Sequence, residues 1–522
     1  MNAGKNGGVI YSDSGNLTVI NSTFINTTAT SDGGAIYSNN GNVTVSNSSF
    51  INTTATSWGG AILGNTVTVT NSNFTNTTGL GSGAGAIYGD NSVNVTDSIF
   101  TNTAGRNGGA IDSYDKVTVT NSIFTNTTGV YGGAILGSNV TVIGSTFINT
   151  AVTGSGGAIF TADNLTVIGS TFTNTTAGSN GGAIYCRSNS NSGSVTVSNS
   201  SFINIKAEGP YCDGGAICSY RGSVTVTGSS FINTKAEGQS GDGGGAIYGD
   251  NGINVTDSTF TDNSARNNGA SIYANCALNV KDSTFNSQNA NGTAIIYIQS
   301  SNKNVNLTNN SITSNLLSIY NDGGNIISPT TLTFNDVTVD AGENATLTAT
   351  LTDDKGNIIG SNKPVKGKVN NNDVDLVFND TSEKFTGIYN QTVKGLYSIT
   401  GNYSNATNCN VTNGTLTVNS ISIDSLEFDI ASKVYGNFSG NITILPVNVA
   451  GNVTIKVDGV KYTQVGLVNG TALWLLTNVT VGTHNITFEY SGDDYYNTAT
   501  NSTIVDITKA DINPEEVTIT TL

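Results

Sequence analysis

The chain has 522 residues, of which 36% are hydrophobic and only 11% charged, and its formal net charge is −16. This length indicates two or three domains, and the acidic charge argues against nucleic-acid binding, which requires a basic face. No apolar run reaches the roughly 18 residues of a membrane-spanning helix, and five cysteines are too few for a disulfide-dense scaffold.

Residues 1–328 carry an internal repeat of about 25 residues. Each unit contains Gly-Gly-Ala-Ile, then an apolar-Thr-apolar triplet such as Val43-Thr44-Val45, and then a phenylalanine in a Ser-rich stretch. The series of phenylalanines includes Phe50, Phe74, Phe100 and Phe124. Each unit thus holds three short strand signals separated by Gly, Asn and Ser turns, and none of them buries a core alone.

The units can bury a common core if each forms one coil of a stack, because every Ile, Val and Phe then lies on its counterpart in the next coil. A β-propeller is the competing repeat fold, but one blade needs about 40 residues. We therefore predict a right-handed parallel β-helix of about twelve coils, in which Phe50, Phe74, Phe100 and Phe124 form a structural ladder.

An asparagine follows two residues after the phenylalanine in most coils, for example Asn52, Asn76 and Asn126. We expect these amides to form a ladder at a corner, each bonding to the coils above and below. We also expect them to point inward, which leaves no room for a glycan. The Gly-Gly pair predicts a tight corner that requires positive φ or a close approach between coils.

From about residue 330 the repeat gives way to plain alternation, which predicts immunoglobulin-like β-sandwiches. We place these domains at 330–419 and 420–509, and residues 510–522 begin a further repeat or linker. An uncapped first coil exposes a pairing edge, so we expect upstream coils or a cap in a longer exported protein.

The pairing of Gly-Gly-Ala-Ile with a downstream Phe and Asn resembles the repeat of chlamydial polymorphic outer-membrane proteins and related β-helix adhesins, over residues 7 to about 315. One departure is that the family's Asn usually lies three residues after the Phe, as here only in the last coils (Phe260 to Asn263). The Asn/Thr-rich style is similar to adhesin-like proteins of methanogenic archaea, and residues 492–497 resemble bacterial immunoglobulin-like repeats. The resemblance implies display at the cell surface, outside the cell, and adhesion.

Many polysaccharide lyases and hydrolases are also β-helices, but their sites need acids clustered over neighbouring coils. Here the exterior strand positions are mostly Thr and Ser, so we expect no catalytic residue, metal ligand or cofactor. The only histidine, His484, aligns with Tyr397 of the first sandwich and is expected in a half-buried strand position. Three cysteines in adjacent coils, Cys186, Cys212 and Cys218, leave open a disulfide from Cys186 or three buried thiols.

The best candidate site is where two successive coils carry enlarged loops, residues 206–213 and 235–242. Stacked at one corner, they would form a lateral protrusion, and insertions in solenoids often lie on the binding face. A tolerated surface insertion is the alternative. The candidate binding residues are Lys206, Glu208, Tyr211, Asp213, Lys235, Glu237 and Asp242.

The sequence thus favours a non-catalytic adhesin-like protein of the cell surface. Its expected partners are surface glycans or proteins of host or neighbouring cells. A secreted β-helix polysaccharide lyase or hydrolase is the first alternative, and a purely structural component of the cell envelope is the second.

Overall fold

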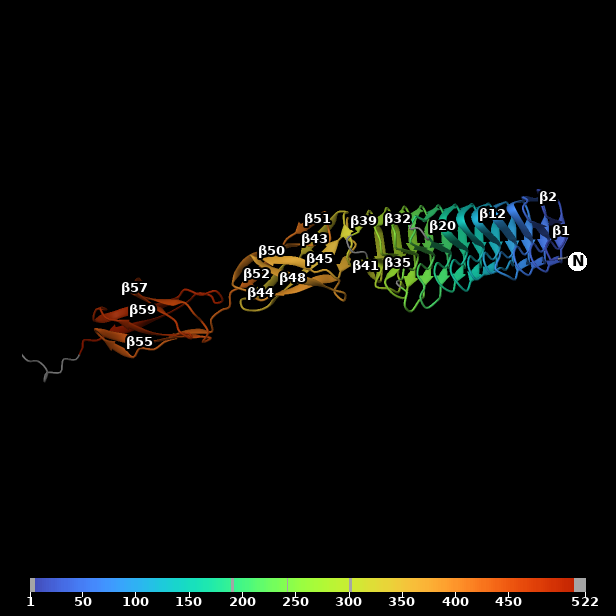
Figure 1. Cartoon of the computed structure of the whole chain (residues 1–522). Helices are drawn as coiled ribbons and strands as arrows, with labels where there is room; N and C mark the ends of the chain where they lie inside the picture. The colour runs from blue at the N-terminus through green and yellow to red at the C-terminus, as the bar shows by residue number, and fades with distance from the viewer. Residues whose placement is uncertain (1–4, 189–191, 242, 300–302, 511–522) are drawn as a thin grey trace, which may run out of the picture.

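The computed structural model describes residues 5–188, 192–241, 243–299 and 303–510, and within them the chain is built of strands joined by turns. A long parallel β-helix is followed in line by two β-sandwiches (Figure 1). The all-β fold class is therefore confirmed. Residues 511–522, most of the expected start of a further unit, lie outside the described residues.

The phenylalanine strands form one twelve-stranded parallel sheet, one strand from each coil, which confirms a rod of about twelve coils. Its strands are β3 (Thr23–Ile25), β7 (Ser49–Ile51), β10 (Asn73–Thr75), β13 (Ile99–Thr101), β15 (Ile123–Thr125), β18 (Thr146–Ile148), β21 (Thr171–Thr173), β25 (Ser201–Ile203), β29 (Ser230–Ile232), β33 (Thr259–Thr261), β37 (Thr284–Ser287) and β40 (Ser311–Ser314).

The isoleucines and the apolar-Thr-apolar triplets lie in a second, 22-stranded sheet that wraps the opposite side of the core. Its strands are β1 (Ile10–Ser12), β2 (Leu17–Ile20), β5 (Ile36–Ser38), β6 (Val43–Ser46), β9 (Ile62–Thr70), β12 (Ile87–Thr96), β14 (Ile111–Thr120), β17 (Ile135–Ile143), β20 (Ile159–Ile168), β23 (Ile184–Arg187), β24 (Ser194–Ser198), β27 (Ile217–Tyr220), β28 (Ser223–Thr227), β31 (Ile247–Gly249), β32 (Ile253–Thr256), β35 (Gly269–Ala274), β36 (Leu278–Lys281), β38 (Ala294–Ile298), β39 (Asn304–Thr308), β41 (Leu317–Asn321), β42 (Asn325–Ile326) and β46 (Ile359–Ser361).

Two-residue strands close the third side of the coils in two further sheets. They are β4 (Thr28–Ala29), β8 (Thr54–Ala55) and β11 (Thr78–Gly79) in one sheet, and β16 (Thr128–Gly129), β19 (Ala151–Val152), β22 (Thr176–Ala177), β26 (Lys206–Ala207), β30 (Lys235–Ala236) and β34 (Ser264–Ala265) in the other.

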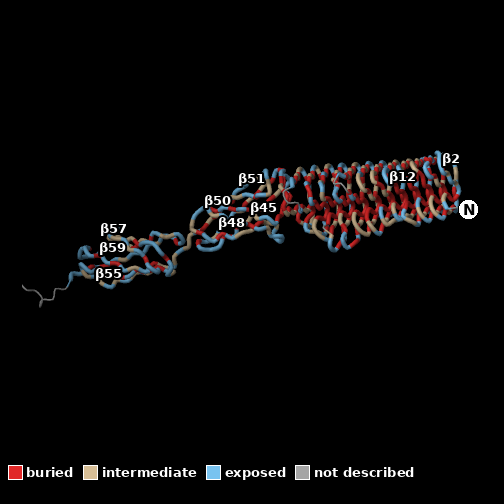
Figure 2. Tube along the Cα trace, viewed as in Figure 1, coloured by how far each residue is buried: buried red, intermediate tan, exposed pale blue. Residues whose placement is uncertain are grey.

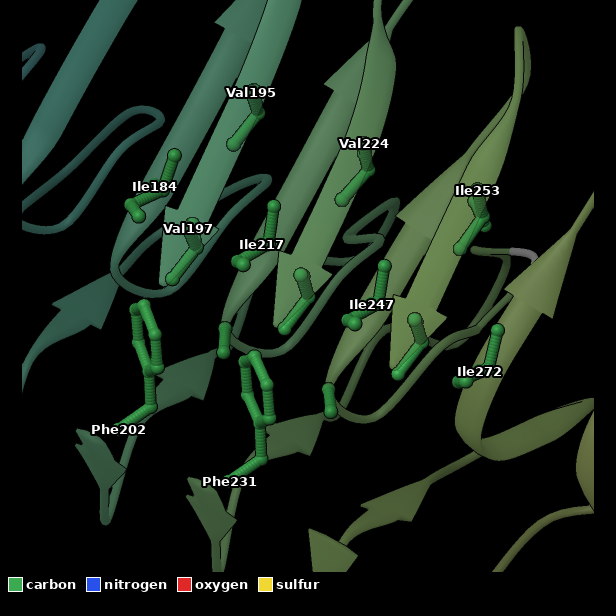
Figure 3. Close-up of a cluster of buried hydrophobic side chains, with 14 of the residues drawn as sticks. Ile184, Val195, Val197, Phe202, Ile217, Val224, Phe231, Ile247, Ile253 and Ile272 are labelled. Atoms are coloured by element: carbon green, nitrogen blue, oxygen red, sulfur yellow. The ribbon is translucent and has the colours of Figure 1, made fainter. Parts of the chain in front are cut away.

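The core of the rod consists of apolar ladders that run along its axis. Phe50 and Phe74 stack with ring centroids 4.7 Å apart, and Phe100 and Phe124 with centroids 4.8 Å apart. These spacings match the distance between hydrogen-bonded strands, and all four rings are fully buried. Figure 3 shows how the Ile, Val and Phe ladders meet in the core, and Figure 2 shows this buried interior along the length of the rod. The predicted structural ladder is confirmed.

The two glycines of each Gly-Gly corner are required for different physical reasons. The first has a positive φ, for example +62° at Gly33. The second lies against the next coil, since a Cβ on Gly34 would be 2.1 Å from the carbonyl oxygen of Gly60. Both expected causes therefore operate, one at each glycine.

The asparagine ladder forms as predicted, but it lies on the outside of the rod. Nδ2 of Asn76 donates to Oδ1 of Asn52 at 3.0 Å, and Asn126 donates likewise to Asn102. All are exposed, so the expected inward orientation is wrong. The cause is a left-handed backbone, with φ of 54° at Asn52 and Asn126, which turns the amide outward.

The first sandwich is joined to the rod by a strand that completes the rod's own sheet. Strand β46 pairs in parallel with β41, which places Ile359 beside Ile319. Tyr403 reinforces this joint, because its hydroxyl donates to Oγ of Ser361 at 2.7 Å and accepts from Asn321 at 3.1 Å. The remaining strands are β43 (Thr330–Phe334), β44 (Val337–Asp340), β45 (Ala345–Thr352), β47 (Val365–Val369), β48 (Asn372–Asn379), β49 (Lys384–Tyr389), β50 (Gly395–Asn402), β51 (Cys409–Thr412) and β52 (Gly414–Asn419).

The second sandwich has a hydrophobic core of its own, separate from the core that the rod shares with the first sandwich. One four-stranded sheet contains β53 (Ser425–Phe428), β54 (Ser432–Val434), β55 (Asn437–Leu445) and β58 (Thr471–Leu476). The other contains β56 (Asn452–Val457), β57 (Val460–Gly466), β59 (Gly482–Tyr490) and β60 (Ala499–Ile507). Across the domain junction, Nζ of Lys394 donates to the carbonyl oxygen of Tyr496 at 2.8 Å.

Candidate functional site

The two enlarged loops stack on one flank of the rod. Strands β26, β30 and β34 pair in parallel there, so Lys206, Lys235 and Ser264 form one column and Ala207, Ala236 and Ala265 the next. The loops that follow are joined to each other, since the backbone N–H of Ser240 donates to the carbonyl oxygen of Pro210 at 2.9 Å. Together they form a protrusion on the side of the rod, visible as green loops in Figure 1.

Charged side chains of opposite sign meet at the base of these loops. Nζ of Lys206 lies 2.9 Å from Glu208 Oε1 and 2.8 Å from Glu237 Oε2. Hydrogen bonds to Glu208 and then Glu237 raise the pKa of Lys206. Because these groups are substantially exposed, the network orients side chains more than it stabilises the fold.

Beside this network is a hollow of about 540 Å³. It is lined by Lys235, Ala236, Glu237, Ser264, Arg266, Asn291 and Gly292. Within the described parts of the chain, Lys235 and Arg266 have no ion-pair partner, so two cations face a carboxylate that Lys206 already binds. We name Lys206, Glu208, Lys235, Glu237 and Arg266 the charged flank.

Arg266 is a member of the charged flank that sequence reasoning missed. The signal was present, because Lys206-Ala207-Glu208, Lys235-Ala236-Glu237 and Ser264-Ala265-Arg266 occupy the same positions of successive coils. Arg266 lies in the coil that follows the second enlarged loop, so a prediction based on the two loops alone does not include it.

The other predicted binding residues have different placements. Tyr211 projects from the first loop with 71% of its surface exposed. Asp213 connects the loops, since its Oδ1 accepts from the backbone N–H of Gly243 at 3.2 Å and its own N–H donates to Asn180. Asp242 lies outside the described residues.

The three cysteines near the flank are free, buried thiols, so the disulfide considered from the sequence is not formed. The strand register explains this: Cys186 lies opposite Ser219, and Cys218 lies opposite Tyr185. Cys218 is therefore one residue out of register with Cys186, and strand alternation sends their side chains to opposite faces. Cys212 instead donates its thiol to the carbonyl oxygen of Ala207 at 3.0 Å.

Among the described residues, no group of three or more His, Cys, Asp or Glu side chains is arranged to hold a metal ion. The hollow beside the charged flank contains one carboxylate, whereas hydrolysis of a glycosidic bond requires a pair. In the same described ranges there is no helix long and apolar enough to cross a membrane.

A family model described as "Right handed beta helix region" matches residues 60–231 of this chain. This agrees with the predicted handedness of the coils. No curated protein matches the chain.

Several solved structures are similar to part of the chain. The adhesin InvE of Yersinia pseudotuberculosis is 18% identical, with a TM-score of 0.25 over 34% of this chain and 58% of that one. The adhesin FdeC of Escherichia coli is 14% identical, with a TM-score of 0.18 over 38% and 67% of the two chains. The fibronectin(III)-like modules of Clostridium thermocellum CbhA are 14% identical, with a TM-score of 0.16 over 34% and 94%. The chain thus spans little more than half of the InvE structure, and likenesses of this size do not extend to a shared function.

Proposed function

We propose that this chain is a non-catalytic, adhesin-like protein of the cell surface, which binds surface glycans or proteins of host or neighbouring cells through the charged flank. The observation that carries the proposal is the hollow beside Lys235 and Arg266 on a lateral protrusion of an otherwise regular rod. Its two cations lack intramolecular ion partners in the described structure, so they are free to pair with acidic groups of a ligand.

Binding fits this hollow better than catalysis does. Its only carboxylate, Glu237, is bound by Lys206 at 2.8 Å, whereas hydrolysis of a glycosidic bond uses a pair of carboxyl groups. The rod and the two sandwiches in line with it would hold the flank away from an anchoring surface.

The test is an array of neutral and acidic surface oligosaccharides, combined with an assay for release of products from the same polymers. We expect acidic ligands to be retained, and the double variant Lys235→Ala/Arg266→Ala to reduce retention about tenfold, the loss typical of one or two charge-assisted hydrogen bonds. The matched control is Lys366→Ala/Lys368→Ala, which removes two exposed lysines from the first sandwich. Turnover of any polymer would overturn the proposal, as would equal loss in the control.

A further inference from the structure

A second pocket lies on the outer face of the rod. It is lined by residues between Trp58 and Ala162, which precede the charged flank in the sequence. It has a volume of about 310 Å³, and its walls include Trp58, Tyr88, Asn107, Asp112, Tyr114 and Phe160. That volume is at the lower end of the range for small-molecule sites (about 300–1,000 Å³).

Asp112 is the exception in a column of apolar side chains. The position directly after each core isoleucine faces outward, and register connects these positions from coil to coil. The column reads Tyr11, Tyr37, Leu63, Tyr88, Asp112, Leu136, Phe160, Tyr185, Cys218, Tyr248, Tyr273, Tyr297 and Tyr320. A single carboxyl in this column has no role in the repeat itself.

The Asp112 carboxyl is buried and lacks a partner. Only 6% of the residue is exposed, and no hydrogen bond or ion pair to its carboxyl is formed by the described residues. Burial raises its pKa to about 8, and no second carboxylate contributes to this shift. A polar group buried in this way costs stability, so a ligand that bonds to it recovers part of that cost.

Aromatic rings stand on both sides of this carboxyl. Trp58 and Tyr88 contact each other with ring centroids 4.5 Å apart at an angle of 52°, and Phe160 lies two coils further along the column. The loop that contains Ser82 and Gly83 packs closely against Trp58, since a Cβ on Gly83 would lie 2.9 Å from Trp58 Cα and Cβ. This loop therefore forms part of the pocket wall, together with the column.

We propose that this pocket binds one sugar ring of a surface glycan, with the C–H face of the ring on the aromatic walls and ring hydroxyls hydrogen-bonded to Asp112. Aromatic faces carry negative charge density that attracts C–H groups. The other polar side chains of the pocket are uncharged amide and hydroxyl groups, which suit a ligand with many hydroxyls better than a lone cation. They belong to Ser82, Tyr88, Asn107, Ser113, Tyr114 and Ser138. The choice of a carbohydrate rests on the proposed function, whereas the pocket does not.

Trp58 provides a direct measurement. The chain has two tryptophans, and Trp474, in the second sandwich, is buried with no partner for its indole N–H among the described residues. Trp474→Phe therefore leaves Trp58 as the only tryptophan of the intact chain. We expect its fluorescence to change saturably with at least one of a panel of free neutral sugars (glucose, galactose, mannose, N-acetylglucosamine and fucose).

Variants of Asp112 in this background decide the assignment. Asp112→Leu, which resembles Leu136 of the next coil, should weaken the sugar response roughly 10-fold to 100-fold and raise the melting temperature. Asp112→Asn keeps the shape and should weaken it less. Asp115→Asn, an exposed residue on the same strand, should leave it unchanged.

Three results would overturn the inference: no saturable response to any sugar, a response that survives Asp112→Leu, or saturation by tetramethylammonium chloride alone. The last result would assign the pocket to a cation. Failure here is distinct from failure of the charged flank, because Lys235→Ala/Arg266→Ala should leave the Trp58 titration unaltered.

Discussion

At the scale of single residues, the rod shows which side chains the repeat explains and which it does not. Phe124 and Val119 are accounted for by stacking, and their spacing in the sequence was enough to predict it. The outward amides of Asn52 and Asn126 were not predictable from spacing, because a left-handed backbone reverses the side-chain direction that strand alternation implies. The sequence alone could have identified Asp112 as the only acid in its column, but only after the residues that follow each core isoleucine had been aligned from coil to coil.

The only histidine has the half-buried strand position that its alignment with Tyr397 predicted. Nδ1 of His484 lies 2.6 Å from Oδ2 of Asp458, a contact that the sequence could not predict because it joins a strand to a neighbouring hairpin turn. The hydrogen bond to Asp458 raises the pKa of His484 above 6.5 and lowers the pKa of Asp458 below 3.8.

The pair should therefore stabilise the second sandwich only within a pH window. Its contribution is lost as pH rises through the raised His484 pKa, and it is lost at the acid end as pH falls through the lowered Asp458 pKa. Because the chain has one histidine, a proton NMR titration follows it directly. Asp458→Asn should shift the midpoint back towards 6.5, and an unchanged midpoint would show that Asp458 has no such effect.

At the scale of elements, the coil is defined by its corners as much as by its strands. The second glycine of each corner lies against the backbone of the next coil, and serines further along, such as Ser98 and Ser122, bond coil to coil. The sequence predicted the glycine corner because only two physical causes exclude Cβ there. It did not predict the buried serine column, since Ser is common throughout this chain.

We predict that Gly109→Ala disrupts the rod, because its Cβ would lie 2.0 Å from the carbonyl oxygen of Gly133. The expected loss is about 3 kcal/mol or more of unfolding free energy, at or beyond the range for overpacking, measured by urea denaturation. The control is Gly169→Asn, because a Cβ at this position would have no other atom within 4 Å. The φ of Gly169 is +57°, a conformation that Asn adopts at the equivalent position of other coils, for example Asn199. This control should change stability by less than about 0.5 kcal/mol, and equal effects of the two substitutions would contradict the close-approach explanation.

At the scale of the whole molecule, the described residues of the three structured parts form two large hydrophobic cores. The rod and the first sandwich share one core through β46, and the second sandwich has another. Strand alternation predicted two sandwiches, but the joint was not predictable, because it pairs Ile319 with Ile359 and no local pattern marks such a contact.

Calorimetry of the full chain should therefore show two main transitions, one for the rod with the first sandwich and one for the second sandwich. Phe488→Ala, in the second core, should lower only the second-sandwich transition, with a cost of about 3–5 kcal/mol typical of a buried phenylalanine. Phe385→Ala, equally buried in the first sandwich, is its counterpart and should lower only the other. A separate transition for the first sandwich would contradict the shared core.

The stacking of the rod has an evolutionary consequence. Since Phe, Asn and Gly-Gly meet their own kind in the neighbouring coil over most of its length, the top of one regular coil fits the bottom of another. Duplication or deletion of a whole coil by recombination between repeated gene segments would then preserve the junctions between regular coils. A lineage could thus lengthen or shorten this rod in single-coil steps. The coils that carry the pocket and the charged flank differ from their neighbours, so duplication or deletion of regular coils would leave them unchanged.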